Sequence, residues 1–137
     1  MSNVLLVTGG SRGIGAATAL LAVQRGYAVA VNYAERRDAA DAVVARIRAG
    51  GGTAIAVQAD VADEGQVLAM FATIDRELGR LTALVNNAGV VDVSCRVEDM
   101  TMARWRRMFD INVIGSFLCA REAIRRMGKR QIGRAHV

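Results

Sequence analysis

The sequence contains no proline, few aromatic residues and no long apolar run. Phenylalanine, tryptophan and tyrosine make up 4% of its 137 residues, although 53% are hydrophobic, and alanine, valine and glycine are abundant. This composition suits helices packed tightly on a sheet and excludes a disordered chain. No stretch approaches the roughly 18 consecutive apolar residues that a membrane span needs. We therefore predict one domain, by length, without a membrane partner.

Signals for secretion and metal binding are also lacking. Residues 1–13 (MSNVLLVTGGSRG) have no basic segment, and their apolar run is too short for a secretion signal. The two cysteines, Cys95 and Cys119, form neither a CxxC pair nor a metal-type spacing. We expect both to be reduced and structural, in a cytoplasmic protein that holds no metal.

The positive charge is concentrated near the end of the chain. The net charge is +5, yet residues 1–103 hold nine arginines against eleven acidic residues, while residues 104–137 hold nine basic residues against two acidic ones. A basic helix face can bind phosphate backbones, or it can be solvated or face a protein partner. No recognised nucleic-acid motif accompanies it, so we predict no nucleic-acid partner.

Strand-like and helix-like patterns alternate along the chain. Strand-like runs lie at 3–7, 27–32, 54–58 and 83–85, and helical spacing follows at 13–25, 37–49, 64–78 and 102–127. This alternation predicts an α/β protein with right-handed crossovers and a Rossmann-type doubly wound parallel sheet of strand order 3-2-1-4. The fourth strand would then be an open apolar edge, which proteins usually avoid, so we expect a sheet that is incomplete on its C-terminal side.

The sharpest local motif is TGGSRGIG at 8–15, between the first strand and the first helix. A bound pyrophosphate needs close backbone N–H groups, and side chains at Gly9 and Gly13 would obstruct its approach. Gly15 would let the helix pack against the strand, and the helix N-terminus attracts anions. The spacing is GxxxGxG, and alone it is also compatible with a simple tight turn.

The second strand ends without the acidic residue that usually holds the ribose of NAD. Residues 32–34 are Asn-Tyr-Ala. Arg12, together with Arg36 or Arg37, can instead pair with a 2′-phosphate through its planar guanidinium, although Arg36 and Arg37 can equally open a solvated helix. We predict a cofactor site that includes Tyr33 and prefers NADP, with NAD possible.

Two more polar segments follow the third and fourth strands. Asp60 can accept a hydrogen bond from an adenine amino group, or it can cap the next helix, as Asp63 also can. Residues 86–89 (NNAG) combine amides with small residues that let the backbone pass under a cofactor; a polar turn is the alternative.

These motifs, with ADV at 59–61 and NVIGSF at 112–117, resemble the short-chain dehydrogenase/reductase family over nearly the whole chain. Bacterial sugar dehydrogenases and 3-oxoacyl-carrier-protein reductases are the most similar branch. The resemblance implies hydride transfer between NAD(P) and a small-molecule carbonyl or secondary alcohol, by a homotetramer or homodimer. It implies that the pyrophosphate and ribose contact Gly9, Ser11, Arg12, Gly13, Ile14 and Gly15, the adenine contacts Asp60 and Val61, and the nicotinamide side contacts Asn86, Ala88 and Gly89.

The same resemblance assigns a catalytic role to Asn112, which matches an asparagine that positions a proton-relay water and a lysine. A helix-buried amide satisfied by backbone groups is the alternative. Family members continue with a serine and a Tyr-x-x-x-Lys pair that perform acid–base catalysis. Here the tyrosines are Tyr27 and Tyr33, and the single lysine is Lys129. We therefore predict an inactive N-terminal fragment of an enzyme, with a non-catalytic dinucleotide-binding module as the alternative.

The last six residues, IGRAHV, resemble a translated sequencing adapter. We expect residues 1–131 to be the N-terminal part of a single domain and residues 132–137 to be a non-native tail. His136 would then have no functional role.

Overall fold

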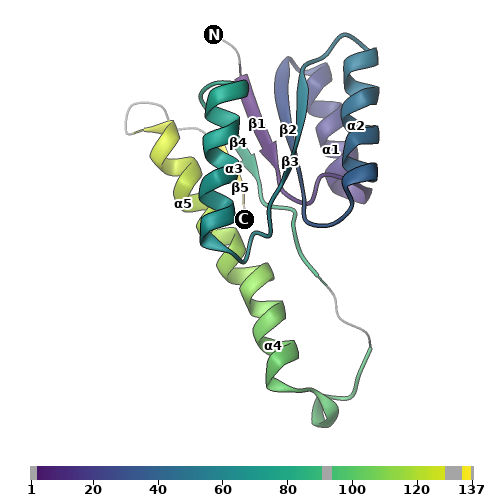
Figure 1. Cartoon of the computed structure of the whole chain (residues 1–137), viewed down its shortest axis with the longest axis vertical. Coiled ribbons are helices and arrows are strands. Elements are labelled where there is room, and N and C mark those ends of the chain that lie inside the picture. The colour runs from purple at the N-terminus through teal and green to yellow at the C-terminus, as the bar shows by residue number, and fades with distance from the viewer. Residues whose placement is uncertain (1–2, 91–93, 129–133, 137) are drawn as a thin grey trace.

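A five-stranded parallel sheet lies between two layers of helices in the computed structural model, which describes residues 3–90, 94–128 and 134–136 (Figure 1). Helices α1 (Gly13–Gln24) and α2 (Arg37–Ala49) cover one face, and α3 (Glu64–Glu77) and α5 (Gly115–Met127) cover the other. The strands are β1 (Asn3–Val7), β2 (Tyr27–Tyr33), β3 (Ala54–Gln58), β4 (Ala83–Val85) and β5 (Arg134–His136).

The strand order confirms the predicted 3-2-1-4 arrangement and adds one strand to it. The order is β3-β2-β1-β4-β5, and every neighbouring pair is parallel. The prediction that the fourth strand is an open edge is wrong, because Ala83–Val85 pairs with Arg134–His136. Strand pairing uses backbone groups that every residue offers, so the short sequence Arg-Ala-His gave no apolar pattern from which to expect it.

Alternate residues of β1 supply the two halves of the core. Val4 and Leu6 pack on the α3 and α5 side, whereas Leu5 and Val7 pack on the α1 and α2 side. All four are at most 5% exposed. Burial on both faces explains why the strand is a continuous apolar run without polar alternation.

The helix predicted over 102–127 contains a change of helix type. Helix α4 (Met102–Phe109) begins at Thr101, whose hydroxyl accepts a hydrogen bond from the Arg104 amide at 3.3 Å. A π-helical turn, Asp110–Ile114, joins α4 to α5. Helix α4 projects away from the sheet, and none of the described helices is long and apolar enough to cross a membrane (Figure 1).

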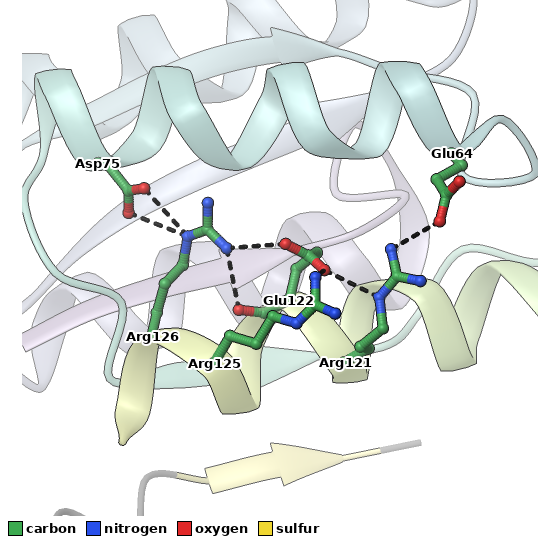
Figure 2. A network of polar contacts seen from close by, with 6 residues as sticks. All are labelled: Glu64, Asp75, Arg121, Glu122, Arg125 and Arg126. Atoms are coloured by element: carbon green, nitrogen blue, oxygen red, sulfur yellow. Dashed lines mark hydrogen bonds and ion pairs between the residues drawn. The ribbon is translucent and has the colours of Figure 1, made fainter.

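Helix α5 is fastened to α3 by a network of charged side chains centred on the buried Glu122 (Figure 2). Arg121 bridges Glu122 and Glu64, and Arg126 bridges Glu122 and Asp75, all at 2.8 to 3.1 Å. Arg125 adds a third pair to the same carboxylate at 2.8 Å. Glu64 and Asp75 lie on α3, so the network fixes the position of α5 against it.

Candidate functional site

A cavity of about 430 Å³ lies at the carboxyl ends of the strands. Its walls come from the glycine loop after β1, from the segments after β2, β3 and β4, and from the helix that begins with α4. In an open parallel sheet this edge is the usual place for a ligand. The lining residues are Gly9, Ser11, Arg12, Gly13, Asn32, Tyr33, Ala34, Glu35, Arg36, Ala59, Asp60, Val61, Asn87, Ala88, Gly89, Val90, Arg107 and Ile111.

The glycine loop uses its glycines in three different ways. Gly9 and Gly13 have φ angles of +60° and +58°, in the left-handed region that favours glycine. A Cβ atom at Gly9 would also lie 3.0 Å from Ala88 Cα, whereas one at Gly13 would meet nothing within 4 Å. A Cβ atom at Gly15 would lie 2.4 Å from the Gly9 carbonyl oxygen. Gly15 was predicted to let α1 pack against the strand. The close approach that it allows is instead between α1 and the glycine loop.

The N-terminus of α1 suits an anion. Its N-cap residue, Arg12, makes no side-chain cap hydrogen bond, and the first turn holds no acidic residue. In contrast, α3 and α4 are capped by Asp63 and Thr101. Uncapped first-turn amides carry partial positive charge, which a phosphate group can neutralise.

Asn32 fixes the shape of the glycine loop, a role that the sequence reasoning missed. Its side chain is 2% exposed, and its Oδ1 accepts a hydrogen bond from the Gly9 amide at 3.1 Å. Its Nδ2 donates to the carbonyls of Val57 and Ala59 at 3.3 and 3.2 Å. An amide at the end of an apolar strand was the available signal, because buried amides need partners.

The segment after β4 is tied to both of its neighbours. Asn87 donates from Nδ2 to the Gly9 carbonyl at 2.9 Å, and the Thr8 hydroxyl accepts hydrogen bonds from the amides of Asn87 and Ala88 at 3.0 and 2.9 Å. Asn86 instead donates to the Ser116 carbonyl in α5 at 3.1 Å. Asn86 is absent from the cavity lining, as are two other predicted cofactor residues, Ile14 and Gly15.

The end of β2 brings a tyrosine hydroxyl and two arginines to the cavity. Tyr33 is 9% exposed, and its hydroxyl makes no hydrogen bond within the described residues. Arg12 and Arg36 line the same cavity. Arg37 does not, and it pairs with Asp41 at 3.6 Å. Of the two arginines predicted as alternatives after β2, only Arg36 is placed at the cavity.

Asp60 is held by two donors at the cavity wall. Its Oδ1 accepts a hydrogen bond from the Ala62 amide at 3.0 Å, and its Oδ2 accepts one from Arg107 Nη1 at 3.1 Å. The helix cap is Asp63, whose Oδ1 accepts from the Gln66 amide at 3.0 Å. The alternative in which Asp60 caps α3 is therefore wrong. The sequence gave no indication of the contact with Arg107.

Asn112 lies in the π-helical turn and holds the segment after β4. Its Nδ2 donates to the Val90 carbonyl at 3.0 Å, and its Oδ1 accepts from the Val90 amide at 2.8 Å. Its own carbonyl accepts a hydrogen bond from the Ser116 hydroxyl at 3.2 Å. The amide is satisfied by backbone groups, as the alternative interpretation expected, but the expected burial is wrong, because Asn112 is exposed. Asn112 does not line the cavity.

The cysteines lie away from this cavity and are free thiols. Cys119 is fully buried, and desolvation raises its pKa to about 12. A thiol with such a pKa stays protonated and unreactive at neutral pH, which fits the structural role predicted for it.

The sheet order, the glycine turn and the cavity at the strand ends define an α/β protein with a Rossmann-type fold. The chain belongs to the short chain dehydrogenase family, whose model matches residues 3–135.

Several relatives are similar over almost the whole chain. The uncharacterized oxidoreductase YgfF of Escherichia coli (strain K12) is 52% identical over 130 residues, which cover 95% of this chain and 53% of that protein. A 3-oxoacyl-[acyl-carrier-protein] reductase of Synechocystis is 45% identical, with 97% and 53% covered. A solved short chain dehydrogenase from Burkholderia cenocepacia J2315, in complex with NADP, superposes with a TM-score of 0.87 at 36% identity, with 95% and 52% covered. The chain thus spans about half the length of these relatives.

Proposed function

We propose that this chain is the dinucleotide-binding half of an oxidoreductase that prefers NADP over NAD. The cavity at the carboxyl ends of the strands is the observation that carries the proposal, because the glycine loop, Tyr33 and Asp60 all meet there. When bound, the dinucleotide supplies or accepts the hydride exchanged with a small-molecule carbonyl or secondary alcohol.

The residues present fit such a group. The left-handed glycines and the uncapped start of α1 leave room and partial positive charge for a pyrophosphate beside Ser11 and Arg12. Asp60 and Val61 would hold the adenine, and Ala88 and Gly89 would line the nicotinamide side. Gly15 and Asn86 support the site from behind, through their close approach to the Gly9 carbonyl and the hydrogen bond to Ser116. Ile14, which is 80% exposed at the start of α1, would contribute through its backbone.

The preference for NADP rests on the charges at the end of β2. Arg12 and Arg36 line the cavity beside Glu35, and the Tyr33 hydroxyl is available as a further donor. Arg36 also pairs with Asp38 at 3.7 Å, in an exposed contact that leaves the guanidinium accessible. A 2′-phosphate can pair with both guanidinium groups, which the 2′-hydroxyl of NAD cannot do.

The test is a titration of NADPH and NADH, followed by nicotinamide fluorescence, with the chain and three variants. We expect Arg12→Gln and Arg36→Gln each to weaken NADPH binding by about tenfold and to leave NADH binding nearly unchanged. Arg37→Gln is the matched control and should change neither. Equal binding of both dinucleotides by the wild-type chain would overturn the NADP preference, and the absence of any binding would overturn the site.

We also propose that the chain alone performs no turnover. Neither tyrosine precedes the single lysine, Lys129, by four positions, so the acid–base pair of the family has no counterpart in the 137 residues. In a longer protein Asn112 would belong to the active site, and residues 132–137 would be replaced by native sequence. Resequencing the gene past the codon for Arg130 tests this. A serine strand followed by Tyr-x-x-x-Lys supports the oxidoreductase, and a native stop after Val137 favours a non-catalytic binding module.

The whole protein is proposed to be a homodimer or homotetramer that uses the helix from α4 to α5. Phe109 and Phe117 are 62% and 65% exposed on this helix, and Met102 is 59% exposed. Exposed apolar surface of this kind marks association sites. Light scattering on the wild-type protein and on a Phe109→Ser/Phe117→Ser variant tests it. A variant that keeps the wild-type mass would contradict this interface.

A further inference from the structure

Arg107 reaches from the projecting helix α4 to Asp60 in the cavity wall. It lies on α4, which contributes no buried residue, yet its Nη1 donates to Asp60 Oδ2 at 3.1 Å. Both residues line the cavity. The pair joins positions 47 residues apart.

A second close contact joins the same helical path to the segment after β3. Ile111 and Gly115 follow Arg107 along the helical path, through the π-helical turn Asp110–Ile114. Ile111 is buried in the same core cluster as Val61, on the α3 side of the sheet. A Cβ atom at Gly115 would lie 2.7 Å from Val61 Cγ2. The helix is therefore docked closely on the Asp60–Val61 segment, and Arg107 is placed at the cavity end of that contact.

We infer that Arg107 is a positioning residue for the adenine base, acting through the Asp60 carboxylate. The inference rests on the proposed dinucleotide site and assigns to Arg107 an effect on how strongly that site binds the adenine base. Each oxygen of the Asp60 carboxylate has one donor, the Ala62 amide at Oδ1 and Arg107 at Oδ2. Each oxygen can accept a second hydrogen bond, so the carboxylate is held in one orientation and still has capacity for an adenine amino group.

Loss of the guanidinium would leave the carboxylate fixed at Oδ1 alone. Rotation about the side-chain torsions would then spread Oδ2 over several orientations, and binding an amino group would have to restrict them again. The effect should appear only with a base that carries an amino group. A general change in charge or folding should affect all dinucleotides alike.

The experiment compares NADPH with its hypoxanthine analogue, in which a carbonyl replaces the adenine amino group. Both ligands carry the same phosphates, so the ratio of their dissociation constants isolates the base. We expect the wild-type chain to prefer NADPH and Arg107→Met to reduce that preference by about threefold to tenfold. Arg107→Lys should restore part of it. Arg106→Met, a neighbouring substitution that does not line the cavity, is the control and should keep the wild-type ratio.

A second comparison establishes that the effect passes through Asp60. In an Asp60→Asn background, Arg107→Met should have no further effect on the ratio, because the charged partner is already gone. An unchanged ratio in Arg107→Met, or equal weakening of both ligands, would overturn the inference while leaving the dinucleotide site intact. A wild-type chain that binds neither ligand would overturn the proposed function, and the inference with it.

Discussion

Helices α4 and α5 follow one another along a single helical path, yet they differ completely in what they bury. Helix α5 buries seven of its 13 residues against the sheet and α3, whereas α4 buries none. Apolar side chains occur in both, since Met102 and Phe109 lie on α4 as Ala123 and Met127 lie on α5. The difference is spatial, because α4 projects beyond the sheet whereas α5 lies against it (Figure 1). An amphipathic pattern shows that a helix has an apolar face. Whether that face is buried depends on whether another element of the chain packs against it.

The largest predicted effect contrasts a phenylalanine that is buried in the body of the molecule with one that is exposed on α4. Phe71 of α3 is fully buried, and the Arg126 guanidinium lies 4.8 Å from its ring centroid. Phe71→Ala should lower the free energy of unfolding by about 3–5 kcal/mol. Phe109→Ala on α4 should change it by less than about 0.5 kcal/mol. Urea unfolding followed by circular dichroism measures both, and comparable losses would show that α4 is covered in solution.

The next contrast concerns the joint between the two regions. Gly115→Ala places a methyl group 2.7 Å from Val61 Cγ2 and should lower the free energy of unfolding by about 1–3 kcal/mol through overpacking. Gly65→Ala, in α3, is the matched substitution, since its nearest neighbour would be Asp63 Oδ1 at 3.4 Å. It should raise the free energy by up to about 1 kcal/mol through helix propensity. If both alanines stabilise the chain, the joint is looser than the structure indicates.

The charged network that fastens α5 should make stability depend on pH. Burial alone would raise the pKa of Glu122, but hydrogen bonds from Arg121 and Arg126 and the charges of Arg125 and Arg121 outweigh it and lower the pKa (Figure 2). An unfolded glutamate titrates near pH 4.3, so the contribution is complete above about that pH and is lost as the pH falls through the lower folded pKa.

Glu122→Gln tests this dependence. It should lower the free energy of unfolding at pH 7 by about 1–2 kcal/mol and flatten the fall in stability below pH 5. The matched control is Glu98→Gln, in the exposed turn Val97–Asp99 before α4, where Glu98 pairs with Arg96. A backbone hydrogen bond and Arg96 also lower the pKa of Glu98, but this pair is exposed to solvent, so we expect a much smaller change there. A control variant with the same flattened profile would assign the pH dependence to carboxylates in general.

The smallest contrast compares two helix caps. Asp63 caps α3 and Thr101 caps α4, each accepting a hydrogen bond from the amide three residues later. Asp63→Ala should lower the free energy of unfolding by about 1 kcal/mol, because α3 unfolds with the sheet. Thr101→Ala should leave the global value nearly unchanged and increase amide exchange within α4 only. Faster exchange throughout the chain after Thr101→Ala would mean that α4 unfolds together with the body.

Local pattern was sufficient for most of the fold. The alternation of apolar runs with helical spacing predicted four strands, their order and the starts of α1, α2, α3 and α4, because parallel strands buried on both faces need continuous apolar sequence. The start of α5 at Gly115 was not predicted, since α4 and α5 were expected as one helix. The glycine loop and the polar segments after β2, β3 and β4 were predicted to share one edge of the sheet, because the carboxyl ends of parallel strands lie at the same edge. Nine of the twelve predicted cofactor residues line the cavity there. Pattern failed at β5, whose pairing depends on backbone groups alone.

What the sequence by itself determined is the periodicity of its elements and the positions where small or polar residues follow a strand, since both are properties of neighbouring residues. Only the tertiary structure decided which distant groups meet. It directed Asn86 to Ser116, both amide atoms of Asn112 to Val90, Asn32 to the glycine loop, and Arg107 to Asp60. These contacts depend on how the segments after the strands and the helix beginning at α4 pack against one another, and no spacing along the chain encodes that packing.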